Sequence, residues 1–293
     1  MSAQQPVPSD LDQTDVGQTD GGPEVEAPPV EQIERLEEPA LPPAQYFDVI
    51  TQRDEALTAA VTAIRAGHSI VLPTDTVYGI GANAMSASAV QGLLDAKQRG
   101  RDMPPPVLIA DAASLGSLVA FIDEDAQALA DRFWPGALTL VLRIQEGLRI
   151  DLGETRGTIA VRVPDHEFTR ALLRRTGPLA VSSANVSGQP SSTDIAGARE
   201  QLGDTVAVYL DAGPTPGATP STIVDFTVST LGTLLRAGAI SLEELHEVAK
   251  FVQAPEEEPE PDVEPEPDVE ADQTEGADQT EGADQTPRTP PDA

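Results

Sequence analysis

The sequence predicts one α/β or α+β domain between two acidic segments of a 293-residue chain. From about residue 45 to residue 252, short apolar runs typical of buried strands alternate with segments whose apolar residues recur at helical spacing. Residues 1–44 and 253–293 contain few of the aromatic and aliphatic residues that a core requires. A hydrophobic content of 39% is sufficient for one sizeable core. We therefore expect one folded domain over 45–252 and two disordered tails.

The two tails hold most of the net charge of −31. Near the C-terminus, Pro-Glu-Pro-Asp-Val-Glu occurs twice from Pro259 and Ala-Asp-Gln-Thr-Glu-Gly occurs twice from Ala271. Repeats this short and polar cannot stack an apolar face, so an extended acidic tail is expected rather than a solenoid. The first residues lack the basic and apolar regions of a signal peptide, and no apolar run is long enough to span a membrane. We expect a cytoplasmic protein without membrane contact.

The first predicted element of the domain is a helix over 54–66, after which Gly67 is a typical C′ residue. A short buried strand is predicted over 69–72 and a loop over 73–79. Ser86 is suited to N-cap a helix that runs to about Lys97. Further strands are predicted at 138–144, 158–163, 179–182, 206–210, 221–226 and 233–235, and further helices at 124–133, 167–175, 195–202 and 242–251. Trp134, Pro135 and Gly136 read as a helix stop with an aromatic packing anchor.

Chemistry is first suggested by the stretch 73–81, Pro-Thr-Asp-Thr-Val-Tyr-Gly-Ile-Gly. Hydroxyls and a carboxylate follow a buried strand, and two glycines allow the backbone to approach a ligand, which favours a functional loop over a plain turn. The glycines also imitate a dinucleotide-binding pattern, but they do not follow their strand directly and no acidic residue comes about twenty positions later. Asp75 is the nearest carboxylate for a metal ion, although it is equally suited to orient the loop, so no metal ligand is assigned.

Cations form the next candidates. Lys97, Arg99 and Arg101 lie just past a predicted helix, where they either grip a triphosphate or satisfy the helix dipole. On the strand over 158–162, alternation places Thr158, Ala160 and Arg162 on one face. Arg162 among apolar neighbours needs an anion or a carbonyl as partner, and a structural salt bridge is the alternative to a ligand.

The last polar candidates follow strands. The stretch 182–188, Ser-Ser-Ala-Asn-Val-Ser-Gly, suits a phosphate or carboxylate site or a capping loop. Ser221 and Thr222 begin a predicted strand, and Leu-Arg-Ala-Gly over 235–238 follows the last one. The three histidines, His68, His166 and His246, have no ligand spacing and are interpreted as surface or loop residues. The chain has no cysteine, which excludes disulfides, thiolate zinc sites and cysteine nucleophiles.

Taken in order, these segments resemble the YrdC-like threonylcarbamoyl-AMP synthases. The resemblance covers about residues 46–250. It is carried by Pro-Thr-Asp-Thr-Val-Tyr-Gly, Lys-x-Arg, Trp-Pro-Gly-x-Leu-Thr-Leu, Val-Arg-Val-Pro-Asp-His, Ser-x-Asn-x-Ser-Gly and Leu-Arg-x-Gly. Each motif alone is weak, whereas the ordered set is specific.

The resemblance implies a single YrdC-like domain, with an open, twisted sheet and flanking helices around a concave, positively lined cavity. It also implies the reaction of L-threonine, bicarbonate and ATP to threonylcarbamoyl-AMP and pyrophosphate, usually with Mg²⁺. This is the first step of N6-threonylcarbamoyladenosine formation in tRNA, and other proteins transfer the threonylcarbamoyl group to the tRNA. Weak RNA binding would be compatible with such a cavity.

The same resemblance implies roles for individual residues. Lys97 and Arg99 would be the catalytic pair that holds the ATP phosphates. The rest of the ATP site would comprise Arg101, Thr158, Ser183, Ala184, Asn185, Ser192 and Arg236. Threonine would be bound by Thr74, Arg162, Ser182 and Thr222, with Arg162 forking its carboxylate.

Two departures from the family pattern stand out. Asp102 and Met103, followed by Pro104, Pro105 and Pro106, replace a segment in which many members have a lysine before a Pro-Leu pair. In place of the folded second domain of longer members, this chain continues with acidic low-complexity sequence. The alternatives are a double-stranded RNA-binding module of the same fold and a paralogue without the threonine reaction. A basic footprint for RNA is not evident from the overall charge.

Overall fold

The computed structural model describes residues 43–254. The predicted disordered tails and their acidic repeats lie almost entirely outside these described residues. Within the range 43–254, no helix is long and apolar enough to cross a membrane.

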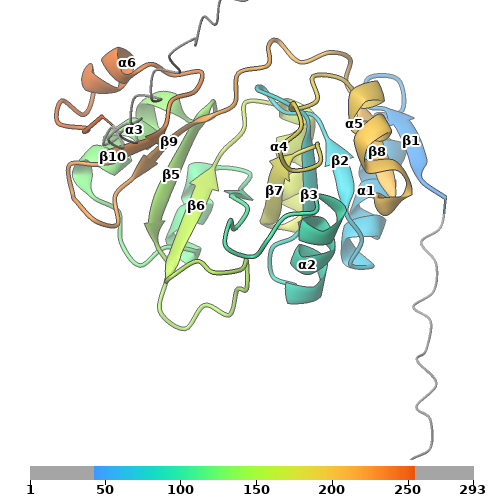
Figure 1. Cartoon of the computed structure of the whole chain (residues 1–293), viewed down its shortest axis with the longest axis horizontal. Coiled ribbons are helices and arrows are strands. Elements are labelled where there is room, and N and C mark those ends of the chain that lie inside the picture. Colours follow the sequence, from blue (N-terminus) through green and yellow to red (C-terminus); the bar gives the residue numbers. More distant parts are fainter. Residues whose placement is uncertain (1–42, 255–293) are drawn as a thin grey trace, which may run out of the picture. The chain divides into compact units, whose positions relative to one another are not determined.

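A single mixed sheet of ten strands organises the domain, with the order β1-β8-β2-β3-β7-β4-β6-β5-β9-β10 (Figure 1). The strands are β1 Gln45–Asp48, β2 Ile70–Leu72, β3 Gly79–Asn83, β4 Val107–Leu108, β5 Leu138–Arg143, β6 Thr158–Arg162, β7 Leu179–Ser183, β8 Val208–Asp211, β9 Thr222–Asp225 and β10 Thr233–Arg236. Strands distant in the sequence are neighbours, since β7 pairs antiparallel with both β3 and β4, and β5 pairs parallel with β9. The predicted α/β class with one open sheet is confirmed.

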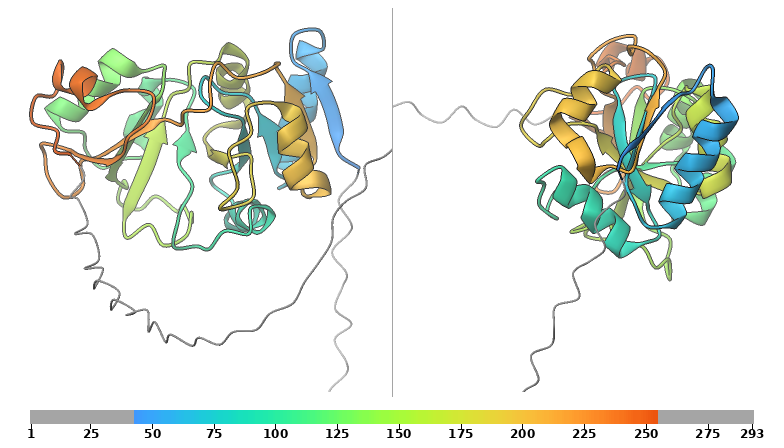
Figure 2. Two further views of the ribbon diagram at one scale, coloured as in Figure 1. Left: turned by 45° about the horizontal axis from the view of Figure 1, so that its top comes forward. Right: turned by 90° about the vertical axis from the view of Figure 1, so that its right-hand side faces the viewer.

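The α-helices cover both faces of this sheet (Figure 2). They are α1 Arg53–Arg65, α2 Ala87–Ala96, α3 Glu124–Phe133, α4 Glu167–Thr176, α5 Ile195–Leu202 and α6 Leu242–His246. Apolar residues of α1 and α4 pack in one core, and those of α2, α3 and α5 pack in another. Two predicted helix boundaries are confirmed in detail, because Gly67 has φ +86° after α1 and the Ser86 hydroxyl accepts a hydrogen bond from Ala89 N.

The last predicted helix is shorter than expected. It was predicted over 242–251, whereas α6 ends at His246. Continuing the helix would prevent the chain from folding back onto β10, where Leu234 N donates to Gln253 O and Gln253 N donates to Gly232 O. These backbone bonds, together with burial of Val252, account for the early stop.

Three strands were not predicted, namely β1, β3 and β4. The glycines of β3 were interpreted as a means to approach a ligand; Gly79 does line the cavity described below, and both glycines also permit close packing inside the sheet. A Cβ on Gly79 would lie 2.6 Å from Val181 Cγ1, and a Cβ on Gly81 would lie 2.7 Å from Leu72 Cδ2. Strand β4 has only two residues, too few to give a periodic signal.

The interpretation of Trp134 as a packing anchor is confirmed. Its indole is buried and Nε1 donates to Leu138 O at 2.7 Å. This contact ties the end of α3 to the start of β5 and so helps to place β5 beside the functional residues described next.

Candidate active site

A cavity of about 360 Å³ opens on one face of the sheet. Seven consecutive strands contribute to its wall, from β3 through β7, β4, β6, β5 and β9 to β10. Strand β6 contributes Thr158, Ala160 and Arg162, the residues that alternation placed on one face. The described residues thus contain the concave cavity that the sequence led us to expect. Besides these three, its wall includes the predicted site residues Thr74, Arg99, Ser182, Ser183 and Arg236.

Arg162 is held firmly at this wall. Its side chain is buried, Nε donates to Gly136 O at 2.9 Å and Nη1 donates to Thr76 Oγ1 at 3.0 Å. Nη2 forms an ion pair of 2.6 Å with Asp75 Oδ1. Burial lowers the pKa of Arg162, and the neighbouring carboxylate of Asp75 partly offsets this effect.

Arg99 lies in the same wall with far fewer partners. Nη1 donates to Ser182 Oγ at 3.0 Å, while the buried Nε has no hydrogen-bond partner in the described part of the chain. Burial lowers the pKa of this guanidinium as well. A buried donor without an acceptor costs about 1–3 kcal/mol, so this geometry favours an anionic ligand that would satisfy it.

Arg236 completes a set of three arginines around the cavity. Nε and Nη2 donate to Ser221 O at 3.1 and 2.7 Å, and Nη2 also contacts Ser221 Oγ. Burial lowers the pKa of Arg236, and the charges of Arg162 and Arg99 lower it further. The three guanidiniums therefore repel one another until an anion enters between them.

Lys97 lies one layer behind the wall. It is 1% exposed, and Nζ donates to Ser183 O and Asn185 O, each at 2.6 Å. Burial, and to a lesser extent the charge of Arg99, lower the pKa of Lys97 to about 8. Lys97 therefore supports the end of β7 and the following loop, instead of satisfying the end of its own helix.

Thr74 and Thr76 link the 73–78 loop to the cavity. Thr74 Oγ1 donates to Val77 O at 2.6 Å and lies 3.1 Å from Thr76 Oγ1. Both residues are buried and both contribute to the wall. Their hydroxyls place polar atoms beside Arg162, as an amino-acid site would require.

Several predicted site residues do not reach the cavity wall. The Arg101 guanidinium forms an ion pair with Asp151 and donates to Gln91 Oε1 at 2.9 Å. Thr222 Oγ1 exchanges hydrogen bonds with the backbone of Ile240 at 2.7 and 2.9 Å. Lys97, Ala184, Asn185 and Ser192 are buried and do not line the cavity, and Ser192 Oγ donates to Ala184 O at 2.7 Å.

Other residues in the wall were not predicted as site residues. The polar ones are Thr76, Tyr78, Thr155, Thr139, Ser191 and Ser221, and the apolar ones include Pro104, Pro105 and Pro106. Thr139 Oγ1 lies 2.8 Å from Ser221 Oγ, so these hydroxyls belong to one network under Arg236. The sequence had indicated part of this group, through the hydroxyls of the 73–81 stretch, which include Thr76, and through the pairing of Ser221 with Thr222 before a strand.

Gly238, two positions after Arg236, lies too close to the neighbouring backbone for any larger residue. A Cβ there would lie 2.4 Å from Thr222 N and 2.5 Å from Pro220 O. We expect Gly238→Ala to destabilise the domain by roughly 2–4 kcal/mol, because backbone atoms cannot yield as a flexible side chain can. Thermal unfolding of the variant checks this, with Gly116→Ala as the control since nothing lies within 4 Å of its added Cβ. Equal Tm values for the two variants would contradict the prediction.

Metal ligands are sparse around the cavity. Across residues 43–254, no group of three or more His, Asp or Glu side chains is placed to hold a metal ion. The carboxylate of Asp75, the metal-ligand candidate of the 73–81 stretch, is already paired with Arg162. Residues 43–254 therefore do not by themselves form a metal cage of His, Asp or Glu side chains.

Comparison with known proteins places this geometry in a family. The model of the Sua5/YciO/YrdC family, described as "Telomere recombination", matches residues 62–238. A Mycobacterium tuberculosis H37Rv protein, named provisionally as a threonylcarbamoyl-AMP synthase, is 51% identical over 67% of this chain and 90% of its own length. The threonylcarbamoyl-AMP synthase of Bacillus subtilis 168 is 37% identical over 69% of this chain and 58% of its own length.

A solved structure is similar as well. Pyrococcus abyssi Sua5 complexed with L-threonine superposes with a TM-score of 0.64 at 38% identity, covering 68% of this chain and 58% of that chain. The chain therefore spans somewhat more than half the length of the archaeal and Bacillus proteins. Because the family model matches more than half of the chain and the 51% identical Mycobacterium relative aligns over 67% of it, the chain belongs to the Sua5/YciO/YrdC family.

Proposed function

We propose that this chain is an L-threonylcarbamoyladenylate synthase, a nucleotidyltransferase that acts in tRNA modification. The observation that carries the proposal is the convergence of Arg99, Arg162 and Arg236 on one cavity. Only Arg162 is paired there with a carboxylate among the described residues. An enzyme that joins a carboxylate-bearing amino acid to a polyphosphate needs such a set of cations. The names of the relatives support the same activity.

The two unpaired arginines would take the phosphates of ATP. Arg99 has a buried N–H without an acceptor among the described residues. The positive charges of Arg162 and Arg99 lower the pKa of Arg236, so an anion would be favourable beside it. Arginine offers a planar fork that matches phosphate oxygens. Ser183 lies in the wall beside them, and Lys97 adds positive charge from behind Ser183. In the loop over 184–192, Ser191 lines the cavity, whereas Ala184, Asn185 and Ser192 do not and would support this side from behind.

The amino-acid end would lie at Arg162. Its guanidinium would fork the threonine carboxylate, with the Thr74 and Ser182 hydroxyls nearby in the same wall. Thr222 would not contact threonine, because its hydroxyl is hydrogen-bonded to Ile240. It would instead fix the position of the neighbouring Ser221, which lines the cavity. Arg101 would contribute indirectly, because its ion pair with Asp151 holds in place the segment that follows α2.

The reaction needs no protein nucleophile. The threonine amine attacks the carbon of bicarbonate and water leaves, which gives a carbamate. A carbamate oxygen then attacks the α-phosphorus of ATP, the bond to the bridging oxygen breaks, and pyrophosphate leaves. Catalysis by this chain would consist of aligning the reactants and stabilising the negative charge that develops on the α-phosphate and on the departing pyrophosphate.

The site suits Mg²⁺ that arrives bound to the phosphates of ATP, rather than Mg²⁺ held by the protein's own side chains. Mg²⁺ retains waters and binds substrate phosphates with few protein carboxylates, which agrees with the sparse acidic residues described above. When bound, it would neutralise phosphate charge. The protein's own contacts to the phosphates would come from Arg99, Arg236 and the Ser183 hydroxyl.

The product would pass to the proteins that transfer the threonylcarbamoyl group to tRNA in the cytoplasm. The alternative of a double-stranded RNA-binding module has no observation in its favour. The cavity is of small-molecule size at about 360 Å³.

Binding of ATP is expected to weaken above pH 8. Lys97 is charged below its pKa of about 8 and neutral above it, so raising the pH removes a positive charge behind the phosphate site. We expect the Kd for ATP to be about sixfold higher at pH 9.5 than at pH 7.5 if the pKa of Lys97 rises by one unit, from about 8, on binding. Calorimetric titration over this range measures it without requiring turnover. A flat profile would show that Lys97 does not contribute charge to ATP binding.

The test of the proposed function is pyrophosphate release by the purified chain with ATP, Mg²⁺ and bicarbonate. Release should require both L-threonine and bicarbonate, with L-serine as the control amino acid. Mass spectrometry of the mixture should show threonylcarbamoyl-AMP. Release that is independent of threonine, or no release at all, would reject the synthase.

A further inference from the structure

Asp75 supplies the only charged contact of Arg162 in the described structure. The other two partners of that guanidinium are a backbone carbonyl and a threonine hydroxyl. The Asp75 side chain is 15% exposed and that of Arg162 is 7% exposed, so the pair is shielded from water. In such surroundings the carboxylate has a strong influence on where the guanidinium points.

The carboxylate of Asp75 approaches Arg162 from outside the cavity. Arg162, Thr74 and Thr76 all contribute to the cavity wall, whereas Asp75 does not. Arginine has five N–H donors, and the three described bonds leave two of them for a ligand. Asp75 therefore supports the guanidinium from behind while leaving part of its fork available.

The loop around Asp75 is fixed at both ends. Pro73 O accepts a hydrogen bond of 2.6 Å from Thr169 Oγ1, and Tyr78 N donates to Ser192 O at 3.0 Å. Between these points, Thr76 N donates to Thr74 Oγ1 at 3.1 Å. A loop with these anchors holds Asp75 in place instead of letting it swing away when a ligand enters.

The charge balance of the cavity differs between its two ends. Arg162 is ion-paired with Asp75, whereas Arg99 and Arg236 have no carboxylate at salt-bridge distance within residues 43–254. A polyphosphate suits the two arginines that have no ion pair. A singly charged carboxylate instead suits the ion-paired arginine, where hydrogen-bond geometry decides recognition more than net charge does.

We propose that Asp75 is a positioning residue, which aims Arg162 at the carboxylate of the amino-acid substrate. This inference rests on the proposed function, because it assumes that Arg162 meets an amino acid. Asp75 itself touches neither the amino acid nor ATP. Its removal should therefore weaken recognition of the carboxylate and leave the phosphate end unchanged.

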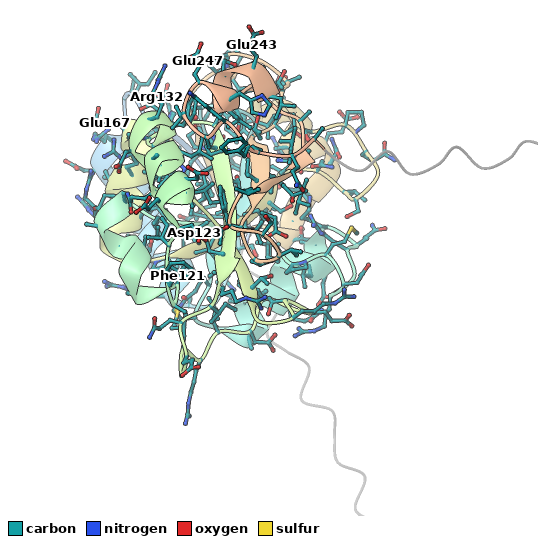
Figure 3. The ribbon with its side chains drawn as sticks, turned by 90° about the vertical axis from the view of Figure 1, so that its left-hand side faces the viewer. Phe121, Asp123, Arg132, Glu167, Glu243 and Glu247 are labelled. Atoms are coloured by element: carbon teal, nitrogen blue, oxygen red, sulfur yellow. The ribbon has the colours of Figure 1, made fainter. Side chains whose placement is uncertain are left out.

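The first experiment compares Asp75→Asn with the unmodified chain. We expect the KM for L-threonine to rise about 10- to 100-fold, as for loss of a hydrogen bond to a charged group, with the KM for ATP unchanged. Glu167→Gln is the matched control, since it removes the carboxylate of an exposed pair with Arg53 at 2.9 Å, on the outer surface of α4 (Figure 3). The control should keep both KM values.

A second readout separates positioning from general damage. The unmodified chain should bind L-threonine more tightly than L-threoninamide, in which a carboxamide replaces the carboxylate. Asp75→Asn should reduce this preference by about tenfold. An unchanged affinity for threonine would overturn the proposal. Tighter binding of threonine would also overturn it, because Asp75 would then be a competitor of the substrate carboxylate.

Asp75→Glu keeps the test decisive if the asparagine variant does not fold. It retains the charge but moves the carboxylate by one methylene group, so the KM for threonine should still rise. A glutamate variant with the KM of the unmodified chain would contradict a positioning role. If the unmodified chain makes no threonylcarbamoyl-AMP, the proposed function fails first, and that result is distinct from any of the Asp75 outcomes.

Discussion

Replacing Arg99 with methionine is expected to lower kcat/KM for ATP by about 10²- to 10⁴-fold. The guanidinium lies in the cavity wall with one side-chain partner, Ser182 Oγ, and with a buried Nε that has no acceptor within residues 43–254. Methionine has a similar length and removes the charge together with that unsatisfied donor. The Tm should therefore stay unchanged or rise, while the activity falls.

Steady-state kinetics and thermal unfolding of the same preparation measure both effects. Arg174→Met is the matched control, because Arg174 is exposed on α4 and its loss changes the net charge equally. The control should retain activity. A fall in Tm that parallels the loss of activity in the Arg99 variant would mean that Arg99 has a structural role instead.

Replacing Lys97 with methionine should reduce both activity and stability. The ammonium group donates to Ser183 O and Asn185 O at 2.6 Å in a buried position, and methionine leaves both carbonyls without this donor. We expect a loss of about 1–3 kcal/mol in the free energy of unfolding, with the desolvation cost of the charge as a partial offset. Activity should fall by about 10²- to 10³-fold, because Ser183 lies in the cavity wall and loses its support.

The only other lysine of the chain provides the control. Lys250 is exposed, so Lys250→Met should leave Tm and kcat/KM as they are. Chemical unfolding gives the free energy, and pyrophosphate release gives the activity. A Lys97 variant of full stability with no activity would place its ammonium in direct contact with the substrate in the working enzyme.

Together these variants separate two kinds of cation in the same motif. Burial of Arg99 destabilises the fold, because its charge is desolvated and its Nε has no acceptor among the described residues. The same N–H is free to bind a ligand, as expected of a binding residue. Lys97 is engaged with backbone carbonyls and supports the wall from behind. The spacing Lys-x-Arg alone cannot distinguish these roles, because it says nothing about which carbonyls lie within reach.

The local sequence determined much of the domain. Helices α1 to α5 were predicted because apolar spacing and capping residues such as Ser86 and Gly67 act over a few neighbouring positions. Arg162 was recognised as a candidate because a charged residue on a buried strand requires a partner. The ordered motifs predicted the family before any contact was known.

Tertiary structure decided what depends on distant partners. Strand β3 forms because it pairs with β2 and β7 on either side. Its glycines are needed because the side chains of Leu72 and Val181 leave no room for a Cβ, which no local pattern reveals. Arg101 faces Asp151, fifty positions away, and so leaves the cavity to Arg99, Arg162 and Arg236. Local spacing supplies the charges of this site, but only long-range packing determines which of them a ligand can meet, because a side chain's partners are set by the strands that the fold brings beside it.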